Sequence, residues 1–238
     1  MKRVFLLGKH YDDTIMHVDD MDIGETNNLS HVIKRSGGIY NFCEAPVKSV
    51  DFAYEPLGLK KAFIISNKSS STRTSFVQNK TSAKIDRKLV NLINKNASWA
   101  HVSYIDDVEE YYNLLLMTTR FSLDFCTTKD RQEYLQVIKN ASVIFDSRER
   151  KQLYNEINVD TPIIFHDELG IEVVQNGNTV YRAYNEPVAG LNVNGAGDIY
   201  SAIFIDKYFE LGLLRAAKEA MIETTKALLD RRSNEQKV

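Results

Sequence analysis

Short apolar runs and helically spaced apolar residues alternate along much of this chain. Arg3–Leu7 and Pro162–Phe165 are compact apolar runs, which predict buried strands. Ile85–Ile93 instead carries its apolar residues at the spacing of a helix that buries one face. Because such strands and helices follow one another from residue 85 to residue 165, the pattern predicts an α/β fold. Its sheet is expected to be mainly parallel, with helices on both faces.

The same pattern gives the other expected elements. Strands are expected at 3–7, 14–18, 61–66, 74–78, 100–104, 121–126, 142–145 and 162–165. Helices are expected at 85–93, 108–117, 131–138 and 148–157. The polar segment Asn67–Arg73 is expected to form a turn between two strands.

The pattern changes after residue 170. Two alternating segments, Ile171–Gln175 and Thr179–Tyr184, flank an Asn-Gly turn at Asn176, which predicts a hairpin. Apolar helices are expected after it, at 199–211 and 214–229. The chain contains no internal repeat or long linker, so residues 1–238 are expected to form a single domain.

The composition excludes several classes of protein. The 30 basic and 32 acidic residues give a net charge of −2, so no overall positive field favours nucleic acid or an anionic membrane. No apolar run reaches the roughly 18 residues of a membrane helix. The two cysteines, Cys43 and Cys126, indicate neither a disulfide framework nor a metal site. We therefore expect a cytoplasmic globular protein without a nucleic-acid or membrane partner.

The strongest chemical signal is the turn Asn194-Gly195-Ala196-Gly197-Asp198, directly before an apolar helix. Small residues let the backbone turn sharply there, and a helix N-terminus offers unpaired N–H groups to a phosphate or a developing anion. Asp198 is either a general base beside this anion hole or only a carboxylate that stabilises the start of the helix.

Two further motifs lie near the N-terminus. Gly37-Gly38 followed by Asn41 allows close approach of the backbone to a ligand, although a plain turn explains it equally well. Gly8 to Asp13 follows the first strand, and ligands bind at the carboxyl ends of parallel strands. Asp13 is therefore a candidate for gripping sugar hydroxyls, and a solvated polar loop is the alternative.

Together these motifs resemble the ribokinase-like (pfkB-type) carbohydrate kinase family. The family signature, roughly Asp-Thr-x-Gly-Ala-Gly-Asp, is similar to residues 192–198, with Asn192 at the usual Asp position. A family Gly-Gly-x-x-Asn element is matched by Gly37, Gly38 and Asn41, and a Gly-x-x-x-x-Asp loop by Gly8 and Asp13. The matches occur in family order over nearly the whole chain. The resemblance implies a three-layer ribokinase-like sandwich with a small β lid, formed by segments near 14–18, 47–54 and 61–78.

The resemblance also implies roles for individual residues. Asp198 would take the proton from the acceptor hydroxyl, while the backbone amides of Gly195, Ala196 and Gly197 form the anion hole. The residues implied to hold the sugar-like substrate are Asp13, Gly37, Gly38 and Asn41. Asn194 and Gly170 would contact ATP, and Asp146 and Glu149 would bind Mg²⁺.

Two segments depart from the family pattern. Asp146-Ser147-Arg148-Glu149 stands where the family has Asn-x-x-Glu, which adds negative charge near the nucleotide. Phe165 to Gly170 stands where the family has Thr-x-Gly-x-x-Gly, and only the last glycine is kept. The stretch between Asn41 and Lys61 is also shorter than is usual for the family.

The resulting hypothesis is an ATP-dependent phosphotransferase that acts on a hydroxyl of a sugar or related small polyol. The alternative is a catalytically degenerate ligand-binding or regulatory protein on the same scaffold, motivated by Phe165, Asp167 and the short middle segment. An exposed edge of the lid sheet would make a homodimer through the lid plausible.

Overall fold

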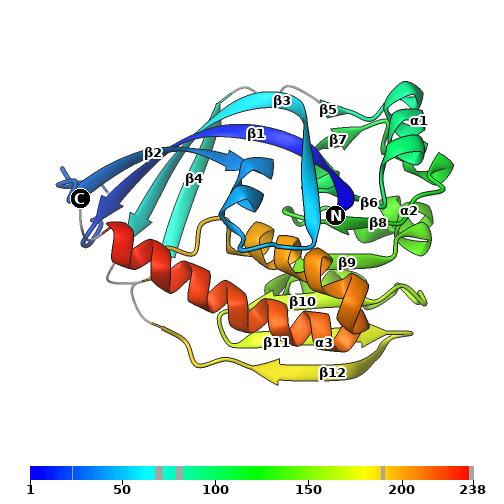
Figure 1. Ribbon diagram of the computed structural model, residues 1–238. Helices are drawn as coiled ribbons and strands as arrows, with labels where there is room; N and C mark the ends of the chain where they lie inside the picture. Colours follow the sequence, from blue (N-terminus) through cyan, green and yellow to red (C-terminus); the bar gives the residue numbers. More distant parts are fainter. Residues whose placement is uncertain (23, 68–71, 79–82, 189–190, 236–238) are drawn as a thin grey trace.

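The computed structural model describes the chain except for residues 23, 68–71, 79–82, 189–190 and 236–238. Part of the expected polar turn, 68–71, therefore lies outside the described residues. The described residues form a ten-stranded sheet covered by helices on both faces (Figure 1). The α/β class predicted from the sequence is confirmed.

The strand order of the sheet places the parallel strands at its centre. The order is β12 (Asn178–Tyr184), β11 (Gly170–Gln175), β10 (Ile163–Asp167), β9 (Val143–Ser147), β8 (Phe121–Asp124), β6 (Trp99–Val102), β1 (Lys2–Val18), β3 (Val50–Asn67) and β4 (Thr72–Gln78), and β2 (His31–Gly38) pairs with β1. Pairing is parallel from β10 through to β3, and antiparallel for β11, β12, β2 and β4. The hairpin expected around Asn176 is thus confirmed as β11 and β12.

The helical segments pack on either side of this sheet. They are α1 (Arg87–Asn96), α2 (Leu135–Asn140), α3 (Ala196–Glu235) and the 3₁₀ helices η1 (Ile39–Glu44), η2 (Ile105–Asp107), η3 (Tyr111–Leu116), η4 (Arg131–Tyr134) and η5 (Arg148–Tyr154). A small separate sheet pairs β5 (Ala83–Lys84) with β7 (Val108–Glu109). Among the described residues, no helix has the length and apolar content needed to cross a lipid bilayer.

Buried strands explain the continuous apolar runs of the sequence. Phe5 and Leu7 pack with α1 and α2 in one core, whereas Val4 and Leu6 pack with α3 in a second core on the opposite face. Successive side chains of a strand point to opposite faces, so a strand covered on both faces is apolar at every position. This arrangement fixes the point after Leu7 at which β1 leaves the central sheet, where the first candidate motif begins at Gly8.

Four strands extend beyond the central sheet and form what we call the projecting sheet: residues 10–18 of β1, β2, residues 59–67 of β3, and β4 (Figure 1). The expected strands 3–7 and 14–18 are one continuous strand, because β1 remains paired with β3 across an irregularity between Gly8 and His10. Residues 14–18 and most of 61–78 lie in the projecting sheet. Whether this sheet acts as a lid stays a prediction.

Two expectations about elements are wrong, and one strand was not expected at all. Residues 50–54 of the expected lid segment 47–54 instead pair with Lys2–Leu6 in the central sheet. The pattern gave no sign of β2, which carries few buried side chains. Residues 108–117, expected as one helix, form β7 and η3, because Glu110 adopts a left-handed conformation with φ 56° between them. The two expected C-terminal helices are present as α3, interrupted at Gly212, where φ is 70°.

Candidate active site

The glycine turn meets the Asn41 motif at the start of α3. Asp198 lies in the first turn of α3 and is 2% exposed. Gly195 has φ 78°, and a Cβ at this position would lie 2.6 Å from Cγ of Asn41. Only glycine combines this backbone angle with such close packing. The turn and the Asn41 motif therefore form one site, although Asn41 and Asp198 are 157 positions apart in the sequence.

Two neutral side chains donate hydrogen bonds to the same oxygen of Asp198. Asn41 Nδ2 lies 2.7 Å from Asp198 Oδ2, and the Tyr104 hydroxyl lies 3.1 Å from it. Tyr104 follows β6 in the left-handed conformation, with φ 59°, which is rare for a residue with a side chain. Burial, and then the charge of Asp198, raise the pKa of Tyr104 well above its usual value, so its hydroxyl remains a donor.

The sequence analysis did not single out Tyr104 as a site residue. A left-handed backbone at a tyrosine has no sequence signal, so only its place after a central strand could have drawn attention to it.

A second buried carboxyl group lies near Asp198. Asp124 ends β8 and is 6% exposed. Burial raises its pKa well above the usual value, and the nearby charges of Asp198 and Asp146 add to this effect. Two carboxyl groups in one site thus lie in different environments: Asp198 accepts two hydrogen bonds at one oxygen, whereas Asp124 favours its neutral form.

The glycine pair makes room for β1 rather than for a ligand. A Cβ on Gly37 would lie 2.1 Å from Oδ2 of Asp13, and a Cβ on Gly38 would lie 2.1 Å from the carbonyl oxygen of Lys9. Gly38 also has φ 63°. The pair lets β2 approach β1 closely and places the buried Asp13 carboxylate against the turn that leads to Asn41. Substrate binding by these residues stays a prediction.

Two arginines and a glutamate, which we call the arginine clamp, hold the loop before Gly195. Arg231, near the end of α3, donates from Nη1 to the carbonyl oxygens of Asn194 at 2.7 Å and Asn192 at 3.1 Å. Arg35 Nη2 donates to the same Asn194 oxygen at 2.9 Å. Glu44 joins them, with Oε1 3.0 Å from Arg35 Nη1 and Oε2 2.5 Å from Arg231 Nη2. The sequence analysis assigned none of these three residues to the site.

One donor of the expected anion hole is already in use. The amide of Ala196 donates to the carbonyl oxygen of Val193 at 3.1 Å, so the prediction that Ala196 offers its N–H to a ligand is wrong for this conformation. Gly197 lies in the first turn of α3, where amides have no acceptor within the helix. The start of α3 therefore offers fewer backbone N–H groups to a ligand than the sequence predicted.

The residues expected to bind Mg²⁺ do not fit that ion. Asp146 is fully buried, and its two carboxylate oxygens accept hydrogen bonds from Arg131, Ser147, Arg150 and Tyr154. These donors use up the lone pairs of the carboxylate. Glu149 is 75% exposed and pairs with Arg150. In the described part of the chain, no group of three or more His, Cys, Asp or Glu side chains is arranged to hold a metal. The prediction of Asp146 and Glu149 as metal ligands is therefore wrong.

The expected nucleotide loop is packed against the glycine turn through His166. A Cβ on Gly197 would lie 3.1 Å from Cε1 of His166, and the His166 ring stacks on Tyr200 with centroids 5.5 Å apart. Burial lowers the pKa of His166 to about 4, so the ring is neutral near pH 7. Gly170 has a structural reason for being glycine, because a Cβ there would lie 2.1 Å from the carbonyl oxygen of Ala183. Nucleotide contacts by Gly170 and Asn194 stay predictions.

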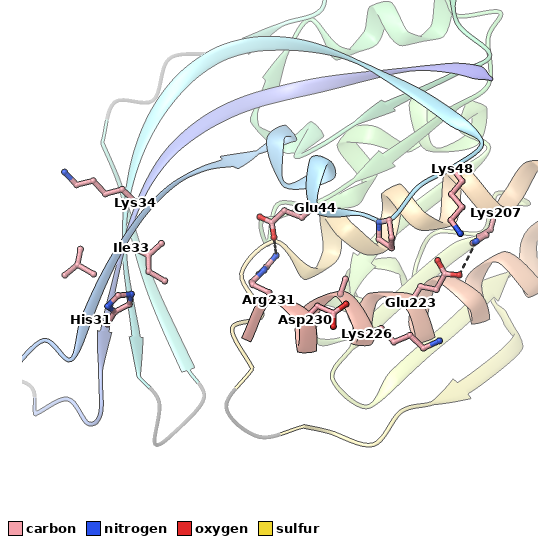
Figure 2. Close-up of a pocket in the computed structure, with 13 residues that line it drawn as sticks. His31, Ile33, Lys34, Glu44, Lys48, Lys207, Glu223, Lys226, Asp230 and Arg231 are labelled. Carbon is pink, nitrogen blue, oxygen red and sulfur yellow. Dashed lines mark ion pairs between the residues drawn. The ribbon is translucent and has the colours of Figure 1, made fainter. Parts of the chain in front are cut away.

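A cleft of about 950 Å³ lies on the other side of the clamp, between β2 and α3 (Figure 2). Glu44 and Arg231 form part of its wall, and Lys207 pairs with Glu223 at 3.1 Å further along. Asp13, Asn41 and Asp198 do not line this cleft. The clamp therefore separates the cleft from the candidate site.

Comparisons with known proteins bear on the fold. No protein-family model matches the sequence, and no curated protein sequence matches it. Solved structures do match. Ribokinase from Thermotoga maritima aligns over 96% of this chain and 92% of its own, with 11% identity and a TM-score of 0.66. Arabidopsis thaliana ribokinase complexed with ribose and ATP gives the same coverage and identity, with a TM-score of 0.68.

A nucleoside kinase also matches. The Burkholderia thailandensis enzyme, in complex with inosine, aligns over 93% of this chain and 89% of its own, with 12% identity and a TM-score of 0.69. These likenesses confirm the ribokinase-like fold, and at such low identity they show the fold alone.

Proposed function

We propose that this chain, which has the ribokinase-like fold, is an ATP-dependent phosphotransferase acting on a hydroxyl of a sugar or related small polyol. The observation that carries the proposal is the convergence of Asn41, Tyr104 and Gly195 on Asp198 at the N-terminus of α3. A carboxylate oriented by two donors, beside a helix N-terminus, matches what hydroxyl-to-phosphate transfer requires. Kinases of the same fold that are complexed with ribose and ATP, or with inosine, support this reading.

Asp198 acts as the general base. It takes the proton of the acceptor hydroxyl as the hydroxyl oxygen forms its bond to the γ-phosphorus of ATP and the bond from phosphorus to the β,γ-bridging oxygen breaks. The electron pair of that bond stays with ADP. Asn41 and Tyr104 hold the Asp198 carboxylate through Oδ2, which orients the base before the acceptor arrives.

The glycine turn stabilises the negative charge of the transferred group. Backbone amides at the start of α3 point their dipoles at the site, and Gly195 and Gly197 keep side chains away from it. The arginine clamp fixes this turn through the Asn194 carbonyl.

The second candidate function is a non-catalytic ligand-binding protein on this scaffold. Three observations favour it. The carboxylate of Asp146 is occupied by hydrogen bonds from Arg131 and Arg150, and the amide of Ala196 donates to a carbonyl oxygen of the turn. Phe165 is buried in the core at the position where the family has a hydroxyl residue. A protein of this kind would bind a sugar-like ligand without turning over ATP.

An acceptor screen separates the two functions. ADP formation is measured by a coupled assay with Mg-ATP and a panel of sugars, polyols and nucleosides, and Mg-ATP binding is measured by calorimetry. The kinase requires ADP formation that depends on an acceptor, with Mg-ATP binding in the micromolar to low-millimolar range. A ligand that raises the melting temperature of the protein while Mg-ATP neither binds nor reacts supports the non-catalytic function instead.

A further inference from the structure

Two buried lysines share a single carboxylate beside the candidate site. Lys9 on β1 and Lys60 on β3 both form an ion pair with Oδ2 of Asp107. The lysine side chains are 2% and 3% exposed, and that of Asp107 is 28% exposed. The two ammonium groups therefore lie just beneath the surface, with one negative charge between them.

Asp106, the carboxylate next to Asp107 in sequence, does not balance the second lysine. Asp106 is committed to Cys126 and Thr127, whose groups donate hydrogen bonds to both of its oxygens. The ammonium of Lys129 adds a further positive charge, because it donates to the backbone oxygen of Asp106. Burial lowers the pKa of Lys9 to about 8 even though Asp107 acts in the opposite direction, which agrees with an undercompensated cation. A buried ammonium without its own counter-ion is costly, so folding alone does not explain the second lysine.

The lysine pair faces the site through two tyrosines. Tyr11 and Lys60 are paired in the register of β1 and β3, so both point to the same face of the projecting sheet, as does Asp13. Lys60 Nζ lies 5.8 Å from the ring centroid of Tyr11, and that ring lies 6.1 Å from the ring of Tyr104. The hydroxyl of Tyr104 contacts Asp198. A contiguous row of side chains thus runs from the lysines to the proposed base.

We propose that the acceptor carries an anionic group, a phosphate ester or a carboxylate, and that Lys9 and Lys60 bind it. The inference rests on the proposed function and specifies its substrate class. The anion approaches beside the partly exposed Asp107 and supplies the counter-charge that the second lysine lacks. The reacting hydroxyl then lies at the opposite end of the acceptor, toward Asp198.

The adjacent lysine provides a matched control. Lys60→Met removes one buried ammonium, whereas Lys61→Met makes the same change at an exposed position paired with Asp12 on the other face of the sheet. Inorganic phosphate is titrated at constant ionic strength while the melting temperature is recorded. Wild type and Lys61→Met are expected to be stabilised, and Lys60→Met to bind phosphate about tenfold more weakly. Equal stabilisation of all three proteins by phosphate overturns the inference.

Matched acceptors then test the substrate class. Ribose, ribose 5-phosphate and ribonate, and glucose, glucose 6-phosphate and gluconate, are compared in the ADP-forming assay and by calorimetry. A preference for the phosphate or the acid that disappears in Lys60→Met supports the inference and identifies which anion is bound. A neutral sugar used as well as its anionic partners overturns it while leaving the kinase proposal intact. Phosphate binding that depends on Lys60 without ADP formation from any acceptor retains the anion site and contradicts the kinase.

Because Lys60→Met removes an undercompensated buried charge, it is expected to keep or raise the melting temperature of the protein. Lys60→Arg keeps the charge and is expected to retain anion binding. If Lys60→Arg remains folded by circular dichroism but no longer binds the anion, then packing rather than charge forms the site. That result contradicts the inference.

Discussion

Arg231 gives the sharpest structural prediction, because one side chain near the end of α3 holds the loop that carries the proposed anion hole. Arg231→Ala removes the hydrogen bonds to the carbonyl oxygens of Asn192 and Asn194 and the ion pair with Glu44. Arg35 still donates to the Asn194 oxygen, so that carbonyl keeps a partner. The Asn192 carbonyl and the Glu44 carboxylate lose contacts that this variant does not replace.

The size of the effect follows from these contacts. A hydrogen bond from a charged donor contributes about 1.5–3 kcal/mol to stability. The ion pair between Arg231 and the partly exposed Glu44 contributes little. Allowing for the remaining Arg35 contact, we expect a loss of about 3 kcal/mol in the free energy of unfolding. For a domain of this size that corresponds to a fall in melting temperature of roughly 6–12 °C. A shift of the loop by about 1 Å would also lower kcat by about 100-fold.

The assay is urea unfolding followed by circular dichroism, with ADP formation measured on the folded variants. Arg215→Ala is the control, since Arg215 is an exposed arginine on the same helix, and its loss is expected to cost less than about 0.5 kcal/mol. Arg231→Lys, which keeps one cation, should recover part of the stability. If Arg231→Ala is no less stable than Arg215→Ala, the arginine clamp does not hold the loop before Gly195.

Three more outcomes are expected. In urea unfolding, Gly195→Ala should destabilise the protein by about 1–3 kcal/mol more than the control Gly177→Ala. Both glycines have positive φ, but only a Cβ at Gly195 would meet Asn41. Equal losses of stability in the two variants would contradict this packing. Tyr104→Phe should lower kcat about tenfold with little change in the free energy of unfolding. A fall in kcat no larger than that of Tyr112→Phe, the same change at an exposed position, would show that the Tyr104 hydroxyl is not used. Burial lowers the pKa of His101 to about 3 and that of His166 to about 4, so between pH 6.5 and 4.5 the unfolded chain binds protons that the folded chain does not. Stability should therefore fall with pH in that window by up to about 2.7 kcal/mol per unit, and a flat profile in urea titrations would rule out buried neutral histidines.

Local sequence patterns were sufficient for the elements that lie within one segment of chain. The apolar runs of β1 and β10, the Asn-Gly hairpin and the turn before α3 each carry their signal in neighbouring residues. That Asn41 and Asp198 serve one site was implied only by the family resemblance, and the structure brings the two side chains together.

Other parts of the site depend on contacts between distant segments, which no local pattern records. Arg231 reaches the Asn194 carbonyl only because α3 folds back at Gly212, and Tyr104 reaches Asp198 only through its left-handed backbone. Asp146 was misassigned for the same reason. Its motif position suggested a cation ligand, but Arg131 and Arg150 come from other elements to occupy the carboxylate.

The role of Asp198 as a base is tested most directly by Asp198→Asn, which keeps the shape of the side chain and removes its ability to accept a proton. With the acceptor found in the screen, kcat is measured by ADP formation and acceptor binding by calorimetry, beside Asp230→Asn as the same change at an exposed position of α3. We expect Asp198→Asn to lower kcat by about 100-fold or more with little change in acceptor affinity, and Asp230→Asn to behave as wild type. Turnover by Asp198→Asn at the wild-type rate would contradict the role of Asp198 as a base.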